Sequence, residues 1–105
     1  MRNSRAWALI SGLLLVSMAA AAANLAGRVT FRGKPLTGAV VTATLIENRR
    51  AGPVTVTRTD SHGQYVLRNL RNGTYALLVN LNGRRIYQGE IALTGASLTK
   101  NIDLE

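Results

Sequence analysis

The stretch TRTDSHGQYVLRNLRNGTYALLVNLNGR, residues 57–84, indicates the fold class of this sequence more clearly than any other part of it. Apolar and polar residues alternate in it over short runs, with the period of two that is typical of β-strands. In its first turn, Asp60 can accept backbone N–H groups two residues further on, and Gly63 can adopt the positive φ that closes the turn. Two more turns are expected at Asn72–Gly73 and at Asn82–Gly83, the second of which is a strong hairpin signal.

The rest of the chain after residue 24 continues this pattern of short strands between turns. It shows no useful helical period, and turn signals recur roughly every 8 to 12 residues, which is typical of a β-sandwich. The predicted fold class is therefore all-β. The seven expected strands are Leu25–Arg32, Ala39–Glu47, Val54–Thr59, Gln64–Asn69, Thr74–Leu81, Arg84–Leu93 and Leu98–Leu104.

Alternation within these strands separates an expected core face from an outer face. The connections include the turn RGKP at residues 32–35 and the loop NRRAGP at residues 48–53. Apolar residues on the outer face would mark a partner surface or a sheet edge. The residues expected to face inward are Ala39, Val41, Ala43, Leu45, Tyr65, Leu67, Tyr75, Leu77, Val79, Leu98, Ile102 and Leu104, and those expected to face outward are Val40, Ile46, Leu78 and Ile86.

Residues 1–23 differ from the rest of the chain and have the layout of a secretory signal peptide. Arg2 and Arg5 form a positive start, an apolar core follows, and a run of alanines supplies an A-x-A cleavage site. We expect cleavage after Ala23, which leaves one domain at residues 24–105 in the periplasm or outside the cell. The alternative is an uncleaved membrane anchor, which would be the only expected association with a membrane.

The domain that remains is small, basic and free of cysteine. Removing Arg2 and Arg5 from the 13 basic residues leaves 11 against 5 acidic residues, a net charge of +6. A secreted domain of this size often uses disulfides. Without them, its stability must come from the core, which buries only about 60% of the surface of so short an unfolded chain.

Two ordered segments carry a family resemblance. GRVTFRGKPLTGAVVTA resembles the G-x-V and G-x-P-L-x-G-A-x-V opening of the carboxypeptidase regulatory-like domain, in the transthyretin-like group. The stretch at residues 57–84 resembles its centre, T-D-x-x-G-x-Y followed by L-x-x-G-x-Y-x-L-x-V. The resemblance implies a seven-stranded Greek-key sandwich. Its relatives are mostly structural or adhesive modules, and some bind sugars, so the fold alone does not assign a function.

The sequence offers no set of residues that is typical of catalysis, a metal or another cofactor. Ser61 and His62 are neighbours in a tight turn, where adjacent side chains point apart, and Asp60 is needed by the turn. A single His and no Cys cannot supply the usual zinc ligands, and the acids are too scattered for calcium. The hydroxyisourate hydrolases of the same fold group use several histidines and end in Y-R-G-S, whereas this chain ends in NIDLE.

The basic residues are the strongest functional signal. Positive surface charge attracts polyanions, and Arg favours bidentate contacts with carboxylate and phosphate. We expect a non-catalytic binding module of the cell envelope with an acidic protein or an anionic glycan as its partner, and no role with nucleic acid. The alternatives are a carbohydrate-binding module, which would need exposed rings such as Phe31 or Tyr87, an accessory domain of a separate envelope enzyme, and plain solubilising charge. The candidate anion-binding residues are Arg68, Arg71, Arg84 and Arg85, and the further basic clusters are Arg28, Arg32 and Lys34, and Arg49 and Arg50.

Overall fold

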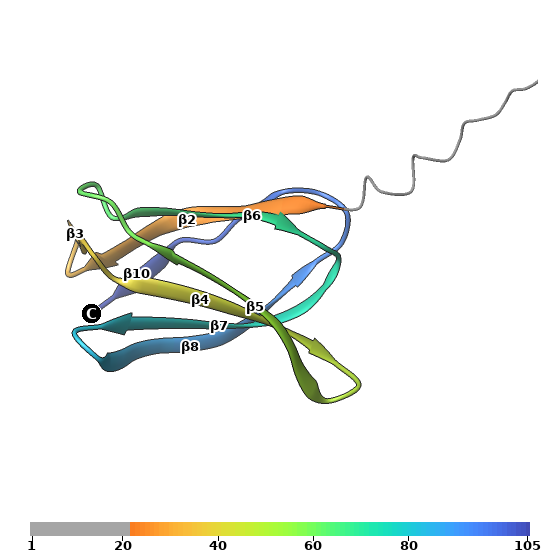
Figure 1. Cartoon of the computed structure of the whole chain (residues 1–105). Coiled ribbons are helices and arrows are strands. Elements are labelled where there is room, and N and C mark those ends of the chain that lie inside the picture. Colours follow the sequence, from red (N-terminus) through yellow and green to blue (C-terminus); the bar gives the residue numbers. More distant parts are fainter. Residues whose placement is uncertain (1–21) are drawn as a thin grey trace, which may run out of the picture.

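The computed structural model describes residues 22–105. This part of the chain folds into two β-sheets that lie face to face (Figure 1). It contains nine strands, labelled β2 to β10, and no helix that could cross a membrane. The expected all-β sandwich is confirmed. The expected count of seven is wrong, because the RGKP turn contains a short strand and the last predicted strand is divided in two. The expected signal segment lies outside the described residues, except for its last two.

The first sheet is built around β2 (Ala23–Phe31), its longest strand. β6 (Gln64–Leu70) runs antiparallel to the first part of β2, and β3 (Lys34–Pro35) runs antiparallel to its end. Two short strands, β9 (Leu98–Thr99) and β10 (Ile102–Leu104), run parallel to β2 on its other edge. The last residues of β2 are therefore paired on both sides.

The second sheet has four antiparallel strands in the order β5, β4, β7, β8. The hairpin between β7 and β8 turns at Asn82 and Gly83, whose φ angles are 52° and 79°. Positive φ at both central residues is the mark of a type I′ turn. The bounds of the strands are Val40–Glu47 for β4, Arg50–Arg58 for β5, Gly73–Leu81 for β7 and Arg84–Leu93 for β8.

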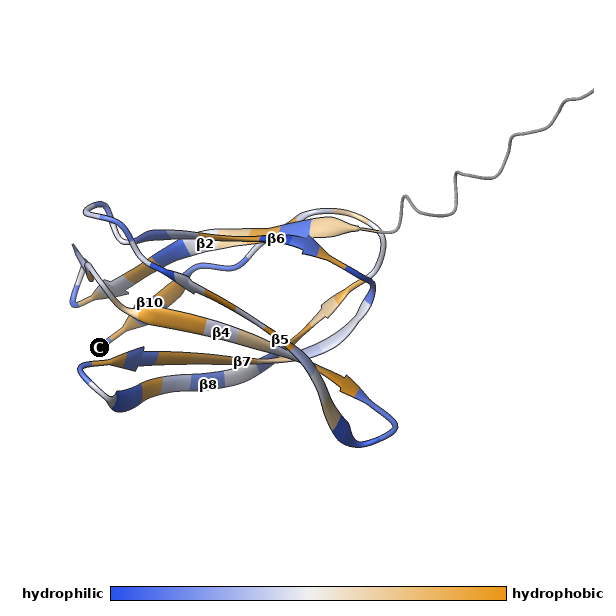
Figure 2. Ribbon diagram, viewed as in Figure 1, coloured by the Kyte–Doolittle hydropathy of each residue, from blue (hydrophilic) through white to orange (hydrophobic). Residues whose placement is uncertain are grey.

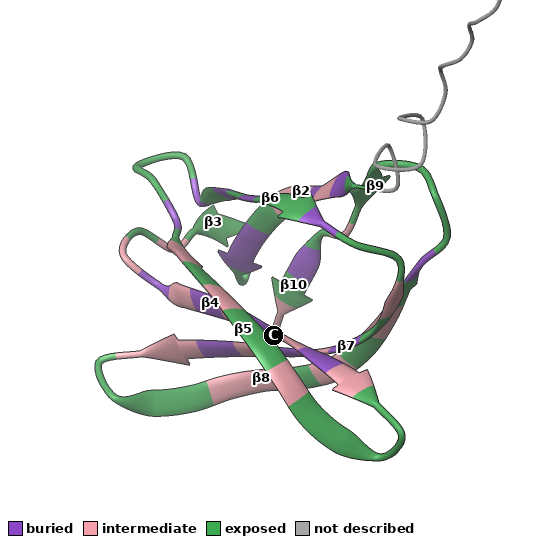
Figure 3. Cartoon of the chain, turned by 45° about the vertical axis from the view of Figure 1, so that its right-hand side comes forward, coloured by how far each residue is buried: buried purple, intermediate pink, exposed green. Residues whose placement is uncertain are grey.

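The core lies between the two sheets, where alternate residues of each strand are buried (Figure 3). Figure 2 shows apolar and polar positions following one another along the same strands. Thr59 is the polar side chain that closes the core near β4: its hydroxyl donates to the Leu36 carbonyl at 2.7 Å and accepts the Ala39 N–H at 2.8 Å. The inward orientation is confirmed for Ala39, Val41, Ala43, Leu45, Tyr65, Leu67, Tyr75, Leu77, Val79 and Ile102, all of which are buried.

The NRRAGP segment is not a loop. β4 turns tightly at Asn48 and Arg49, both with positive φ, and β5 begins at Arg50. The register between β4 and β5 then shifts opposite Gly52 and Pro53. Pro is tolerated there because β5 is an edge strand, where the missing N–H leaves no ladder bond unmade.

The last predicted strand is interrupted at Lys100 and Asn101. The Lys100 N–H donates to the Ala26 carbonyl at 2.7 Å, and the side chain of Asn101 accepts the Arg28 N–H at 3.0 Å. Lys100 and Asn101 therefore separate β9 from β10, and the alternation of inward and outward side chains does not continue across them. Leu98 is therefore 39% exposed, although the sequence placed it inward.

Candidate functional site

The turn between β5 and β6 is organised by the Asp60 carboxylate. Its Oδ1 accepts the backbone N–H groups of His62 at 2.8 Å and Gln64 at 2.9 Å. The N–H of Gln64, and then that of His62, lower the pKa of Asp60 below its ordinary value, because they stabilise the charged form. Gly63 has a φ of 74°, and a Cβ there would lie 2.6 Å from the Val29 carbonyl oxygen. Both residues therefore serve the backbone of the turn.

Ser61 and His62 are exposed at the tip of this turn. The hydrogen bond that ties His62 to Asp60 comes from its backbone N–H and not from its ring. Within residues 22–105, no three His, Cys, Asp or Glu side chains form a group that could hold a metal ion.

Asn72 and Gly73 lie where the chain passes from β6 in the first sheet to β7 in the second. The Tyr75 hydroxyl donates to the Arg71 carbonyl at 2.7 Å and so fixes this connection. Gly73 has a φ of 150°, and a Cβ there would lie 2.7 Å from Leu45 Cδ1 in the core. The pair therefore forms a crossing between sheets and not a hairpin.

The four candidate anion-binding residues do not lie together. Arg84 and Arg85 begin β8, whereas Arg71 precedes β7 and Arg68 lies on β6. With a rise of about 3.4 Å per residue, β7 alone separates Arg71 from Arg84 by roughly 27 Å. Arg71 is also engaged, since its guanidinium lies 2.8 Å from the Glu47 carboxylate. The two pairs of Arg are therefore at opposite ends of the sandwich.

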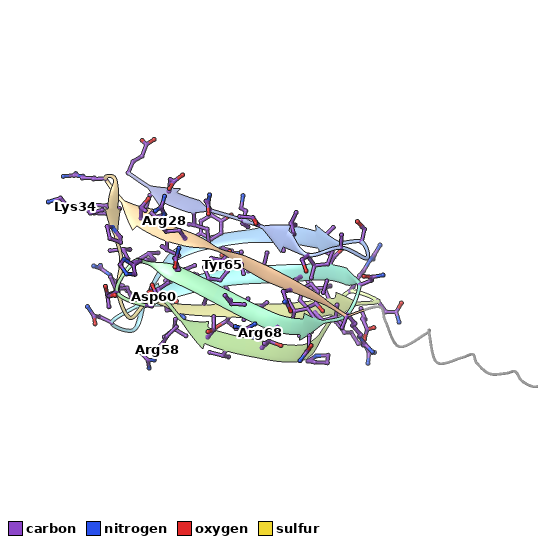
Figure 4. The ribbon with its side chains drawn as sticks, turned by 90° about the horizontal axis from the view of Figure 1, so that it is seen from above. Arg28, Lys34, Arg58, Asp60, Tyr65 and Arg68 are labelled. Atoms are coloured by element: carbon purple, nitrogen blue, oxygen red, sulfur yellow. The ribbon has the colours of Figure 1, made fainter. Side chains whose placement is uncertain are left out.

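Arg84 and Arg85 instead share their end of the sandwich with cations from two other segments, the β2–β3 hairpin and the end of β5. This end holds β3, the start of β4, the β7–β8 turn and the C-terminal residue (Figure 1). Figure 4 shows Lys34 and Arg58 at this end and Arg68 further along the molecule. We call it the basic end and define it by Arg32, Lys34, Arg58, Arg84 and Arg85.

Strand register places two of these cations on one face. Arg58 pairs with Val40, Val40 with Asn80, and Asn80 with Arg85. Directly paired residues lie on the same side of a sheet, so this row crosses the outer face of the second sheet. Three strand spacings put the backbones of Arg58 and Arg85 about 14 Å apart.

The cations of the basic end have no acidic partner. In the part of the chain that the structure describes, the one ion pair joins Arg71 to Glu47 at the other end. Three acids lie near the basic end: Asp60, which accepts the N–H groups of its own turn, Asp103, whose Oδ1 accepts the Thr30 hydroxyl at 2.7 Å, and Glu105. Five cations against these three acids leave the basic end with a net positive charge.

A hollow of about 410 Å³ opens between the two sheets at the basic end. Five of its six lining residues are apolar. We call it the basic-end cavity. Its lining residues are Phe31, Leu36, Leu81, Ile86, Leu104 and Glu105.

Ile86 lines this cavity although alternation along β8 placed it outward. The register between β7 and β8 shifts at this point: Val79 pairs with Tyr87, and Asn80 pairs with Arg85. Ile86 is thus the extra residue of a β-bulge, which changes the face to which a side chain points. It is half-buried and packs against the core, so the outward prediction is wrong.

The outer face of the second sheet carries the other apolar residues that the sequence placed outward. Val40, Ile46 and Leu78 are half-buried there. Val54 and Val56, on the neighbouring edge strand β5, are 56% and 58% exposed. Val40 lies between Arg58 and Arg85 in the row of paired residues, so this surface adjoins the basic end.

The chain matches the family model of the carboxypeptidase regulatory-like domain over residues 24–105. No curated protein matches it in sequence. Solved structures that resemble it include the dioxygenase domain of a dioxygenase carbohydrate-binding protein fusion from Streptomyces sp. SirexAA-E, with a TM-score of 0.59 and 15% identity over 78% of both chains.

Two further structures give the same result. One is a protein from Pseudomonas aeruginosa that is proposed to bind carbohydrate, with a TM-score of 0.55 and 12% identity over 79% of this chain and 88% of that one. The other is 5-hydroxyisourate hydrolase from Klebsiella pneumoniae, with a TM-score of 0.55 and 17% identity over 77% of this chain and 90% of that one. At these identities the likeness concerns the fold.

Proposed function

Because the chain belongs to the carboxypeptidase regulatory-like domain family, we propose that it is a non-catalytic binding module, exported to the cell envelope, whose basic end binds an anionic glycan or an acidic protein. The export part of this proposal rests on the signal-like residues 1–23. The binding part rests on the geometry of the basic end.

The observation that carries the proposal is that, within residues 22–105, the five cations that three separate segments bring to the basic end form no ion pair with an acid. Cations that are not neutralised within a fold raise the local potential and attract anions. Four of the five are Arg, whose planar guanidinium contacts a carboxylate, sulfate or phosphate through two parallel hydrogen bonds. A polymer with repeated anionic groups suits cations that are spread over about 14 Å.

Retention on an immobilised anionic glycan such as heparin, measured across a salt series, tests this proposal. Exposed charges are screened within about 8 Å at physiological ionic strength, so retention should fall as salt rises. The Arg84→Glu/Arg85→Glu variant should elute at clearly lower salt than the wild type. Its folding should be unchanged, because surface substitutions usually alter stability by less than about 0.5 kcal/mol.

The matched control is Arg49→Glu/Arg50→Glu, which makes the same change in net charge at the other end of the sandwich. Both pairs lie in or beside a two-residue hairpin turn. If retention depends on the basic end, the control should elute close to the wild type. Equal losses in the two variants would mean that net charge alone causes retention, and the proposal would then be wrong.

A second candidate is the binding of a neutral carbohydrate, and the exposed Phe31 ring is the observation that favours it. Phe31 is 41% exposed and stands at the rim of the basic-end cavity, whereas Tyr87 is half-buried against the core. An aromatic face can stack on a sugar ring. Titration with neutral oligosaccharides would support this candidate if the wild type bound them at high salt and Phe31→Ala did not.

A further inference from the structure

The basic-end cavity is an extension of the hydrophobic core that reaches the surface. Leu36, Leu81, Ile86 and Leu104 pack against the core cluster and at the same time line the cavity. Phe31 forms its most exposed wall. The volume of about 410 Å³ lies within the range of roughly 300–1,000 Å³ that is typical of small-molecule sites.

Three features of the fold hold this cavity open. The bulge at Ile86 turns an apolar side chain toward the gap between the sheets. The Arg32 N–H donates to the Leu104 carbonyl at 2.8 Å, which fixes the C-terminal strand beside Phe31. At the tips of the neighbouring hairpins, Gly33 and Gly83 have no atom within 4 Å of the place where a Cβ would stand. These tips therefore project into open space and leave the cavity uncovered.

Three cations lie directly beside lining residues. Arg32 follows Phe31, and its guanidinium carbon lies 5.1 Å from the centre of the Phe31 ring, a cation–π contact. Lys34 pairs with Phe31 across the β2–β3 hairpin, and Arg84 pairs with Leu81 across the β7–β8 hairpin. Arg85 precedes Ile86 in the chain but lies on the outer face of the second sheet. The single acid in the lining is Glu105.

We propose that the basic-end cavity binds the hydrocarbon part of an anionic amphiphile, a molecule with an alkyl or acyl chain and a phosphate or carboxylate headgroup, which the surrounding Arg and Lys side chains hold. This inference rests on the proposed function, because the same cations would bind the anionic group. It adds an apolar part to the ligand. Charge decides against a second copy of this domain as the occupant, since two basic ends would repel each other.

The test compares two ligands with one headgroup, dodecyl phosphate and butyl phosphate, both below their critical micelle concentrations, by isothermal titration calorimetry. Affinity should rise by about fourfold for each methylene that enters the cavity, until the cavity is full. Neutral dodecyl maltoside should bind at least tenfold more weakly than dodecyl phosphate. Equal affinity for dodecyl and butyl phosphate, or equal affinity for the neutral and the charged dodecyl ligand, would overturn the inference.

Variants separate the two parts of the site. Phe31→Ala should reduce the affinity for dodecyl phosphate and leave that for butyl phosphate nearly unchanged. Arg84→Glu/Arg85→Glu should lower the affinity for both alkyl phosphates, and Arg49→Glu/Arg50→Glu should change neither affinity. Glu105→Gln should raise the affinity for both, because it removes a negative charge from the lining. Circular dichroism confirms that each variant is folded, and Leu104→Ala replaces Phe31→Ala if that variant is not. An unchanged preference for the longer chain in both apolar variants would contradict a site in this cavity.

Heparin retention distinguishes failure of this inference from failure of the proposed function. If the wild type is retained on heparin in a manner that depends on Arg84 and Arg85, but shows no preference for the longer alkyl chain, the cavity has no ligand role and the anion-binding proposal stands. If neither heparin nor the alkyl phosphates bind, both proposals are wrong.

Discussion

The Tyr65 hydroxyl donates a hydrogen bond of 2.6 Å to the carbonyl oxygen of Lys100, 35 residues further along the chain. This bond reaches from β6 across β2 to the segment between β9 and β10. It passes over Gly27, where a Cβ would overlap the same carbonyl oxygen. The three residues therefore hold the C-terminal segment onto the first sheet, and that segment ends in the wall of the basic-end cavity.

Tyr65 should titrate at unusually high pH. Burial of its ring raises the pKa of Tyr65 to about 12 from an ordinary value of 10.0. A raised pKa means that the folded state favours the neutral phenol, so this stabilisation is complete below about pH 10 and is lost as pH rises toward about 12. Ultraviolet titration of the tyrosines should show late ionisation of Tyr65 in addition to that of Tyr75, whose pKa burial also raises. In Tyr65→Phe, the late part of the titration should lose one group, and an unchanged titration would contradict the assignment.

Gly27→Ala should destabilise the domain strongly. The added methyl would displace the Lys100 backbone and the Tyr65 ring, and overpacking of this kind typically costs about 1–3 kcal/mol. Gly33→Ala is the control, because a Cβ there meets no atom within 4 Å and its cost comes from positive φ alone, about 1 kcal/mol. Chemical denaturation gives both free energies of unfolding. A larger loss for Gly33→Ala would contradict the role given to Gly27.

Asp60→Ala should lower the free energy of unfolding more than Ser61→Ala or His62→Ala does, because only Asp60 accepts the N–H groups of the turn. The pKa of Asp60 is lowered in the fold, so its contribution is present above the ordinary value of 3.8 and is lost as pH falls through the folded value. In Asp60→Asn, the acid-dependent part of the stability should shrink. If His62→Ala instead removed a biochemical activity without affecting stability, the structural interpretation of this turn would be wrong.

Export should remove residues 1–23 from the protein. The prediction follows from the two arginines, the apolar core and the alanine run at the start of the sequence. Intact mass spectrometry of the protein recovered from the envelope or the medium measures the result directly. A mass that begins at Asn24 supports cleavage after Ala23, whereas a mass that retains Met1 contradicts it.

Local chemistry made much of the sandwich predictable. Alternation identified the buried faces of β4, β6 and β7, because a half-buried strand places every second residue in the core. The bounds of β8, Arg84–Leu93, agree with the prediction, since Asn82–Gly83 has a single favoured hairpin geometry. The buried face of a strand and the geometry of a hairpin turn depend on residues that are close in the sequence, so both could be predicted from the sequence alone.

The basic-end cavity depends on contacts that are distant in the sequence, and no local pattern indicates it. Ile86 faces the cavity only because a bulge shifts the register of β8 against β7. Arg68 and Arg84 are separated because β7 carries the chain from one end of the sandwich to the other. Arg32 and Arg84 lie at the same end of the sandwich because the β2–β3 hairpin of the first sheet and the β7–β8 hairpin of the second sheet both turn there. The positions of the Arg residues in the sequence therefore do not indicate at which end of the sandwich each of them lies.

The position at which an anionic glycan contacts the domain is the most direct test of binding at the basic end. Backbone amide shifts, recorded by nuclear magnetic resonance while a heparin-derived oligosaccharide is added, locate this contact. We expect the largest shifts in residues 31–34, at Arg58 and in residues 81–86. Shifts centred instead on Arg49, Arg50 and Arg68, or spread evenly over all exposed Arg and Lys residues, would contradict binding at the basic end.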